Sequence, residues 1–255
     1  MNPKPSPFKG WPTAVNMPYG MNQVLYPSET AAAPVAPAPA APSAPATTAG
    51  TGLHAVLREG TQAAHGRIES ALALGRLGTQ PEDLQRYGRV LQAFALFQRH
   101  WQPRVRAALP PPLHAWLDAS PRLDWLLQDL EAMALPPPAA ELPDPTQALA
   151  LPGASAALAS LYVLEGSALG GQVIVRALSR TAPGLAERAT RYFQGHGART
   201  GAHWRQFCSL LADTPPETPH GWPGAVRASN LTFDALLDSA RTLGATAGPA
   251  CTRTA

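Results

Sequence analysis

The sequence of 255 residues contains few of the residues that build covalent frameworks or zinc sites. Cys208 and Cys251 are its two cysteines, and they belong to no spaced pattern. Two unpatterned cysteines argue against a disulfide framework and against a zinc site, and they favour a reducing compartment.

Long apolar runs and nucleotide-binding motifs are also missing. No run approaches 18 apolar residues, so we expect no membrane span. The N-terminal stretch MNPKPSPFKGWPTAVNM lacks the continuous apolar core of a signal peptide, and we therefore expect a cytoplasmic protein. There is no GxGxxG motif linked to a strand, so a flavin or nicotinamide site is not expected.

Lysine is nearly absent, and the formal net charge is only +3. Lys4 and Lys9 are the only lysines, so arginine carries almost all of the positive charge. The arginines are scattered along the chain and form no basic stripe, which argues against a nucleic-acid partner.

The first 50 residues differ in composition from the rest of the chain. They include the low-complexity stretch AAAPVAPAPAAPSAPATTAG, which is rich in alanine and proline and has no charge. Proline removes backbone donors and blocks helix formation. We predict a disordered extension over residues 1–50, one domain over 51–243 and a flexible tail over 244–255.

The central part of the chain reads as helices, with no convincing alternating strand and no repeat. Apolar spacing and breaker residues predict helices over 53–72, 79–101, a short segment around Trp116, a segment opened by Ser120 and Pro121, 153–179, 185–194, 200–211 and 223–243, with a loop over 136–145. The sequence therefore predicts an all-α, single-domain helical bundle.

One predicted helix, in the stretch LYVLEGSALGGQVIVRAL, is interrupted by Gly166, Gly170 and Gly171. Each glycine inside a helix costs roughly 0.5–1 kcal/mol relative to alanine. The glycines could bring bare backbone against a flat, bulky ligand, or they could allow close packing of two helices through Gly166 and Gly170. The residues alone leave both explanations open.

A second segment places a histidine on the buried face of a predicted helix. The residues that share this face are Leu57, Thr61, His65, Ile68 and Leu72. Glu69 follows His65 by one turn, where its carboxylate can accept the Nδ1 proton and leave Nε2 available for a metal. The neighbours of His65 are small, which leaves room for a planar ligand. The alternative is a core histidine with one hydrogen bond.

Together these two stretches resemble the heme oxygenase family. LREGTQAAHGRIE is similar to the family's proximal helix and EGSALGGQVI to its glycine-rich distal helix. PEDLQRYGRVLQAFALFQRHWQP and RYFQGHGARTGAHWRQFCSLL resemble other family segments in the same order. The resemblance covers roughly residues 53–240 and is strongest to the bacterial, biliverdin-producing branch that includes enzymes associated with bacteriophytochromes.

The resemblance implies a heme-oxygenase-like fold and a chemistry. His65 would ligate the heme iron, with Glu69 supporting its ring. Gly166, Ser167 and Gly170 would form the catalytic distal surface, and Gly171 would contact the cofactor. Heme would be cleaved with O2 to biliverdin, iron and carbon monoxide, using electrons from a separate ferredoxin, flavodoxin or reductase.

The resemblance also marks a departure and a set of rim residues. Ser167 stands where the animal-type pattern has an aspartate, so it is open which group orders the distal water. Arg58, Tyr162 and Arg205 match positions that bind the heme propionates. The remaining histidines considered, His54, His100, His196 and His203, are expected at the surface or the rim.

Other functions remain open at this stage. The chain could bind heme without turning it over. A di-iron oxidase on the same scaffold would need several carboxylates and histidines converging in the core. A thiamine-degrading relative would need a buried cysteine nucleophile, for which Cys208 is the candidate. Biliverdin could serve a bacteriophytochrome, or iron release could serve nutrition.

Overall fold

The computed structural model describes residues 52–73 and 83–246, and the regular structure in these two ranges is helical. The prediction of an all-α fold is therefore confirmed. The predicted disordered extension over 1–50 lies outside the described residues, and so does the predicted tail beyond residue 246.

The described residues form ten α-helices, and the connection between α6 and α7 is long. In chain order they are α2 (Leu53–Gly60), α3 (Gln62–Leu72), α4 (Asp83–Ala108), α5 (His114–Asp118), α6 (Arg122–Ala132), α7 (Ala154–Thr181), α8 (Pro183–Arg188), α9 (Arg191–Gln194), α10 (Thr200–Ala212) and α11 (Pro223–Thr242). Two short 3-10 turns, η2 (Pro111–Leu113) and η3 (Gly197–Arg199), precede α5 and α10.

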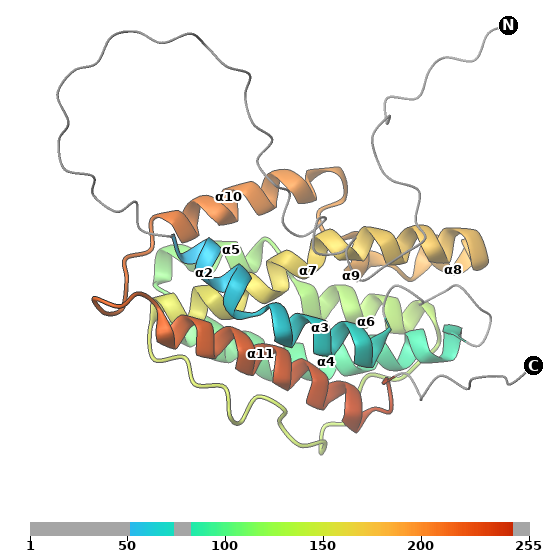
Figure 1. Cartoon of the computed structure of the whole chain (residues 1–255). Coiled ribbons are helices and arrows are strands. Elements are labelled where there is room, and N and C mark those ends of the chain that lie inside the picture. The colour runs from blue at the N-terminus through green and yellow to red at the C-terminus, as the bar shows by residue number, and fades with distance from the viewer. Residues whose placement is uncertain (1–51, 74–82, 247–255) are drawn as a thin grey trace, which may run out of the picture. The chain divides into compact units, whose positions relative to one another are not determined.

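The helix α7 is central to the packing of the described residues. It packs against α11, α10, α9, α8 and α4 (Figure 1). Its first half is almost continuously buried, from Ala156 to Glu165. An 18-residue window of α7 has a mean hydropathy of 1.4, so its length and composition would suffice for a membrane span, although 61% of the window is buried inside the protein. Burial among other helices is what a core helix shows.

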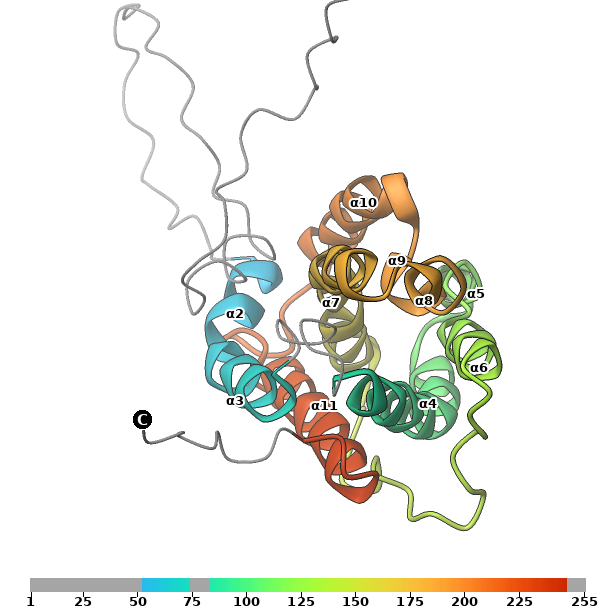
Figure 2. The same cartoon turned by 90° about the vertical axis from the view of Figure 1, so that its right-hand side faces the viewer.

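The helix α11 links the two segments that the sequence singled out. It packs against α7 and α4 and also against α2 and α3 (Figure 2). Among the described helices, α3 and α7 each pack on α11 rather than extensively on one another. The histidine segment and the glycine-rich segment therefore share α11 as their common neighbour.

Three helix boundaries differ from the prediction. The predicted helix over 53–72 is divided at Thr61, whose hydroxyl donates to the Leu57 carbonyl at 2.8 Å. The helix predicted to end at Trp101 continues through Pro103 to Ala108. The helix predicted over 185–194 is two short helices, because the chain leaves helical geometry at Ala189 and Thr190.

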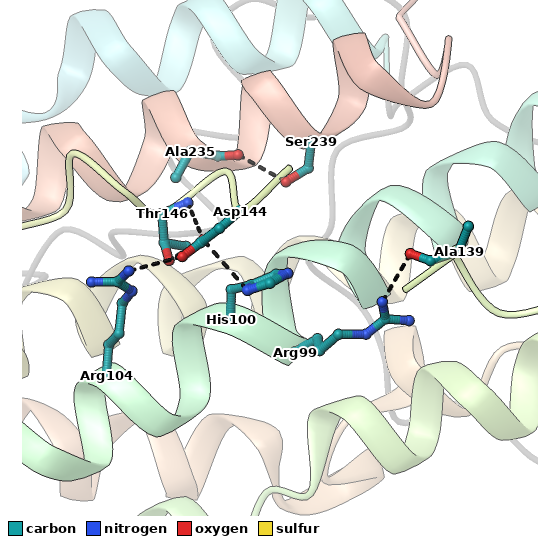
Figure 3. Close-up of polar contacts among 8 residues, drawn as sticks. All are labelled: Arg99, His100, Arg104, Ala139, Asp144, Thr146, Ala235 and Ser239. Carbon is teal, nitrogen blue, oxygen red and sulfur yellow. Dashed lines mark hydrogen bonds and ion pairs between the residues drawn. The ribbon is translucent and has the colours of Figure 1, made fainter. Parts of the chain in front are cut away.

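The loop between α6 and α7, predicted over 136–145, is held to α4 by hydrogen bonds from Gln92 and Arg99 to its backbone carbonyls and by the carboxylate of Asp144 (Figure 3). Asp144 accepts hydrogen bonds from the Thr146 backbone at 2.7 Å and the Thr146 hydroxyl at 2.6 Å. Arg104 Nη2 donates to Asp144 at 2.8 Å, and His100 Nδ1 lies 3.6 Å from it. Partial burial raises the pKa of Asp144, but the Thr146 and Arg104 hydrogen bonds outweigh that effect and bring it to about 2.

Candidate functional site

His65 lies where the apolar spacing placed it, among residues that face the core. Leu57, Ile68 and Leu72 are all buried, as predicted for this face, although the helix is divided at Thr61. The His65 side chain is 18% exposed and its ring lies edge-on to Phe233 of α11 at 5.9 Å. The imidazole therefore stands at the margin of the core, where a ligand can reach it.

The His65 imidazole has the protonation state and the neighbour that metal ligation requires. Burial lowers the pKa of His65, so the ring is neutral at neutral pH. Its Nδ1 lies 3.5 Å from Glu69 Oε2, on the side that leaves Nε2 available. Burial also raises the pKa of Glu69. A carboxylate on Nδ1 with Nε2 open is the arrangement found behind metal-bound histidines.

The glycines of α7 separate into two kinds. A Cβ on Gly171 would come within 2.5 Å of the Phe193 carbonyl oxygen, so this glycine is required by close packing on α9. A Cβ on Gly166 would meet only the Trp204 ring, at an ordinary 3.7 Å. Packing thus explains Gly171 and leaves Gly166 unexplained by the surrounding protein. Gly170 is buried.

Ser167 is exposed, and its hydroxyl donates to the Leu164 carbonyl at 2.9 Å. This local bond is the ordinary behaviour of a helical serine. The oxygen of Ser167 can still accept a hydrogen bond from water or from a ligand.

The three predicted rim residues come from helices that meet near Trp204. Tyr162 of α7 is buried and its ring lies 5.8 Å from Trp204 and 6.1 Å from His54. Arg58 of α2 is exposed and close enough to His54 to lower the pKa of His54, after the larger effect of burial. Arg205 of α10 is exposed and follows Trp204 in the chain.

The structure also contains a buried polar cluster that sequence reasoning missed. Glu165, which directly precedes Gly166, is 1% exposed and lies 2.8 Å from Arg122 Nη2. Trp116 Nε1 donates to the same carboxylate at 2.8 Å, and His203 Nε2 lies 3.1 Å from its other oxygen. The His203 ring stacks on Trp116 at 4.2 Å and lies 3.9 Å from the His196 ring. His203, expected at the surface or the rim, is therefore part of this cluster, with a side chain that is 13% exposed.

Tyr192 of α9 lies between this cluster and Ser167. Burial of its phenol raises the pKa of Tyr192 to about 12, although part of the residue is accessible. Arg122, Gln98 and Ser167 are close enough to the phenol to oppose that shift. Tyr192 therefore adds a neutral hydroxyl beside the Ser167 segment of α7.

Two of the alternatives, the di-iron oxidase and the thiamine-degrading enzyme, lack support in the described residues. In residues 52–73 and 83–246, no three histidine, cysteine, aspartate or glutamate side chains are placed to hold a metal ion, whereas a di-iron centre would need such a group. Burial raises the pKa of Cys208 to about 11, so the thiol is protonated. A protonated, half-buried thiol is a poor nucleophile.

Comparison with known proteins identifies the family. A sequence model of the family described as Heme oxygenase matches residues 51–235. The chain belongs to the heme oxygenase family. A heme oxygenase from Xanthomonas campestris pv. campestris (strain 8004) is 34% identical over 143 residues, which cover 53% of this chain and 77% of that protein. No solved structure gives a significant match.

The residues of this heme oxygenase family member suit a heme. A neutral imidazole with a carboxylate behind it suits the iron, as at His65 and Glu69. A helix with a glycine that packing does not require suits close approach of a flat ring, as at Gly166. Exposed arginines suit carboxylate groups, as at Arg58 and Arg205.

Proposed function

We propose that this protein is a heme oxygenase that cleaves heme to biliverdin and releases iron and carbon monoxide. The observation that carries the proposal is the neutral His65, backed by Glu69 on α3, together with Gly166, which has no packing requirement, on α7. Both helices pack on α11, which makes it their common support. When bound, the heme supplies the O2 chemistry, and the protein supplies position and protons.

In this proposal the two helices have different tasks. His65 Nε2 would ligate the iron, and Glu69 would keep the proton on Nδ1. The backbone at Gly166 and Gly170 would approach the ring, and Ser167 would offer a hydroxyl that orders water. Gly171 acts by keeping α7 in close contact with α9, because its missing Cβ leaves room for the Phe193 carbonyl.

The heme propionates would lie near the meeting point of α2, α7 and α10. Arg58 and Arg205 would pair with the carboxylates, since a guanidinium matches a carboxylate with two parallel hydrogen bonds. The Tyr162 hydroxyl would add a donor from α7. Support for this placement comes from the contacts of Tyr162 and His54 with Trp204, which join these helices.

The partners follow from the reaction. Heme cleavage needs electrons, and the sequence contains no GxGxxG motif for a flavin or a nicotinamide. A separate ferredoxin, flavodoxin or reductase would supply them. We further propose that the protein is cytoplasmic and that its biliverdin serves as chromophore for a bacteriophytochrome.

Product analysis tests this proposal. The purified protein is mixed with one equivalent of hemin, a ferredoxin reducing system and air, and the pigment is extracted and identified by chromatography. Biliverdin, carbon monoxide and ferrous iron in equal amounts support the proposal. Recovery of intact heme would show that the protein binds heme without turning it over.

A further inference from the structure

Glu165 is a buried carboxylate next to the glycine segment, and several side chains bind it. Its partners come from three helices other than its own: Trp116 of α5, Arg122 of α6 and His203 of α10. Burial alone would raise the pKa of Glu165, but Arg122 and His203 outweigh it and hold the pKa at about 2. The carboxylate is therefore charged at neutral pH.

Burying the negative charge of Glu165 costs free energy, so its partners must hold the carboxylate in a defined place. A buried ion is tolerated only when it is paired and its hydrogen-bonding capacity is filled. Arg122 is itself only 6% exposed, so neither member of the pair can turn to solvent. The pair consequently fixes the position of α7 relative to α6 at residue 165.

The fixed point lies at the start of the glycine segment. Glu165 is adjacent to Gly166, and the glycines that follow weaken the helix because they lack side chains. At the other end, Gly171 is held by its close approach to Phe193. The backbone from 166 to 170 thus lies between two fixed points. One is the ion pair of Glu165 with Arg122, and the other is the close contact of Gly171 with Phe193.

We propose that Glu165 is a positioning residue that sets where the Gly166–Gly170 backbone lies over the heme, and thereby which meso carbon is attacked. This inference rests on the proposed heme cleavage. Glu165 does not touch the substrate in this account. It acts through the backbone of α7, and its loss should let that backbone move and so broaden the site of cleavage.

Several charged and titratable groups surround Glu165. Arg122 and His203 face it directly, and the phenol of Tyr192 is near enough for the Glu165 charge to raise its pKa. His196 lies behind His203; its pKa is lowered chiefly by burial and then by His203. Glu165→Gln removes the negative charge from this group and leaves Arg122 unpaired.

The test compares Glu165→Gln with a matched control, Asp144→Asn. Asp144 also binds an arginine and a nearby histidine, but it lies on the loop before α7 and holds that loop to α4 (Figure 3). The first measurement is hydrogen exchange of the heme-free protein over residues 161–178. Glu165→Gln should exchange there about tenfold faster than the parent, because local opening sets the exchange rate. Asp144→Asn should leave that segment unchanged.

The second measurement is the isomer composition of the biliverdin made by each protein. The parent and Asp144→Asn should give one pattern, whereas Glu165→Gln should give a second isomer at about one part in ten or more. Trp116→Phe removes a single hydrogen bond and keeps the ring against His203; it should move both measurements in the same direction to a smaller extent. This variant serves if Glu165→Gln does not fold.

The outcomes separate the two levels of the account. If the parent makes no biliverdin, the proposed function fails. The exchange data then still show whether Glu165 holds the backbone of α7 in place. If the parent makes biliverdin but the Glu165 and Trp116 variants keep both its exchange pattern and its isomer pattern, the positioning role is refuted. Faster exchange with an unchanged isomer pattern would leave Glu165 as a fold-stabilising residue and would also overturn the inference.

Discussion

Substituting alanine at Gly171 and at Gly166 should change stability in opposite directions. A Cβ on Gly171 would approach the Phe193 carbonyl oxygen to 2.5 Å, and backbone atoms cannot turn aside. Overpacking of this kind costs about 1–3 kcal/mol, and the better helix propensity of alanine returns about 0.5–1 kcal/mol. We therefore expect Gly171→Ala to lose about 1–2 kcal/mol of unfolding free energy.

Gly166→Ala should instead gain about 0.5–1 kcal/mol, because its Cβ would only touch the Trp204 ring at 3.7 Å and the propensity gain remains. Thermal unfolding of the heme-free proteins measures both changes. For a protein of this size, 1 kcal/mol corresponds to about 2–4 °C in Tm. If Gly171→Ala is as stable as Gly166→Ala, the steric argument for α7 and α9 is refuted.

Three further predictions concern the iron ligand, the distal backbone and pH. His65→Ala should bind heme without a histidine ligand to the iron, and added imidazole should take the place of that ligand. A six-coordinate heme spectrum without imidazole would contradict the assignment. Gly170→Leu should abolish turnover in a product assay while heme still binds, and a normal rate of biliverdin formation would argue against close backbone approach. Burial raises the pKa of Asp129 from 3.8 to about 6. The protonated form of Asp129 is thus favoured in the native state, so this one group should remove at most about 3 kcal/mol of unfolding free energy as pH rises from 4 to 6. The unfolding free energy of the parent minus that of Asp129→Asn, measured with denaturant, should fall over this pH range, and a difference that does not change with pH would exclude this role of Asp129.

The fold could be predicted where helical spacing and breaker residues act locally. The predicted helices over 153–179, 200–211 and 223–243 correspond closely to α7, α10 and α11. The predicted helix end at Trp101 was wrong, because α4 accommodates Pro103 inside the helix and continues to Ala108. Leu127 of α6 is 38% exposed, because the buried face of this helix carries Leu126 and Leu130 instead.

The candidate site divides in the same way. The face that carries His65 and the nearby Glu69 follows from local helical spacing, and the structure keeps both residues together. The anchor of Glu165 depends on side chains from α5, α6 and α10, which no periodicity connects. Its sequence signal was an acidic residue in an otherwise apolar, buried helix, which requires a partner without naming it. Similarly, only the packed structure shows that close packing requires Gly171 and does not require Gly166.

The central claim is that the protein degrades the heme that it binds. The most direct measurement is an absorption time course of the purified protein with one equivalent of hemin, started by a ferredoxin reducing system in air. The account predicts a Soret band that forms on binding and then decays as the broad red band of biliverdin rises. A Soret band that persists through many minutes of reduction, with no red band, would contradict it.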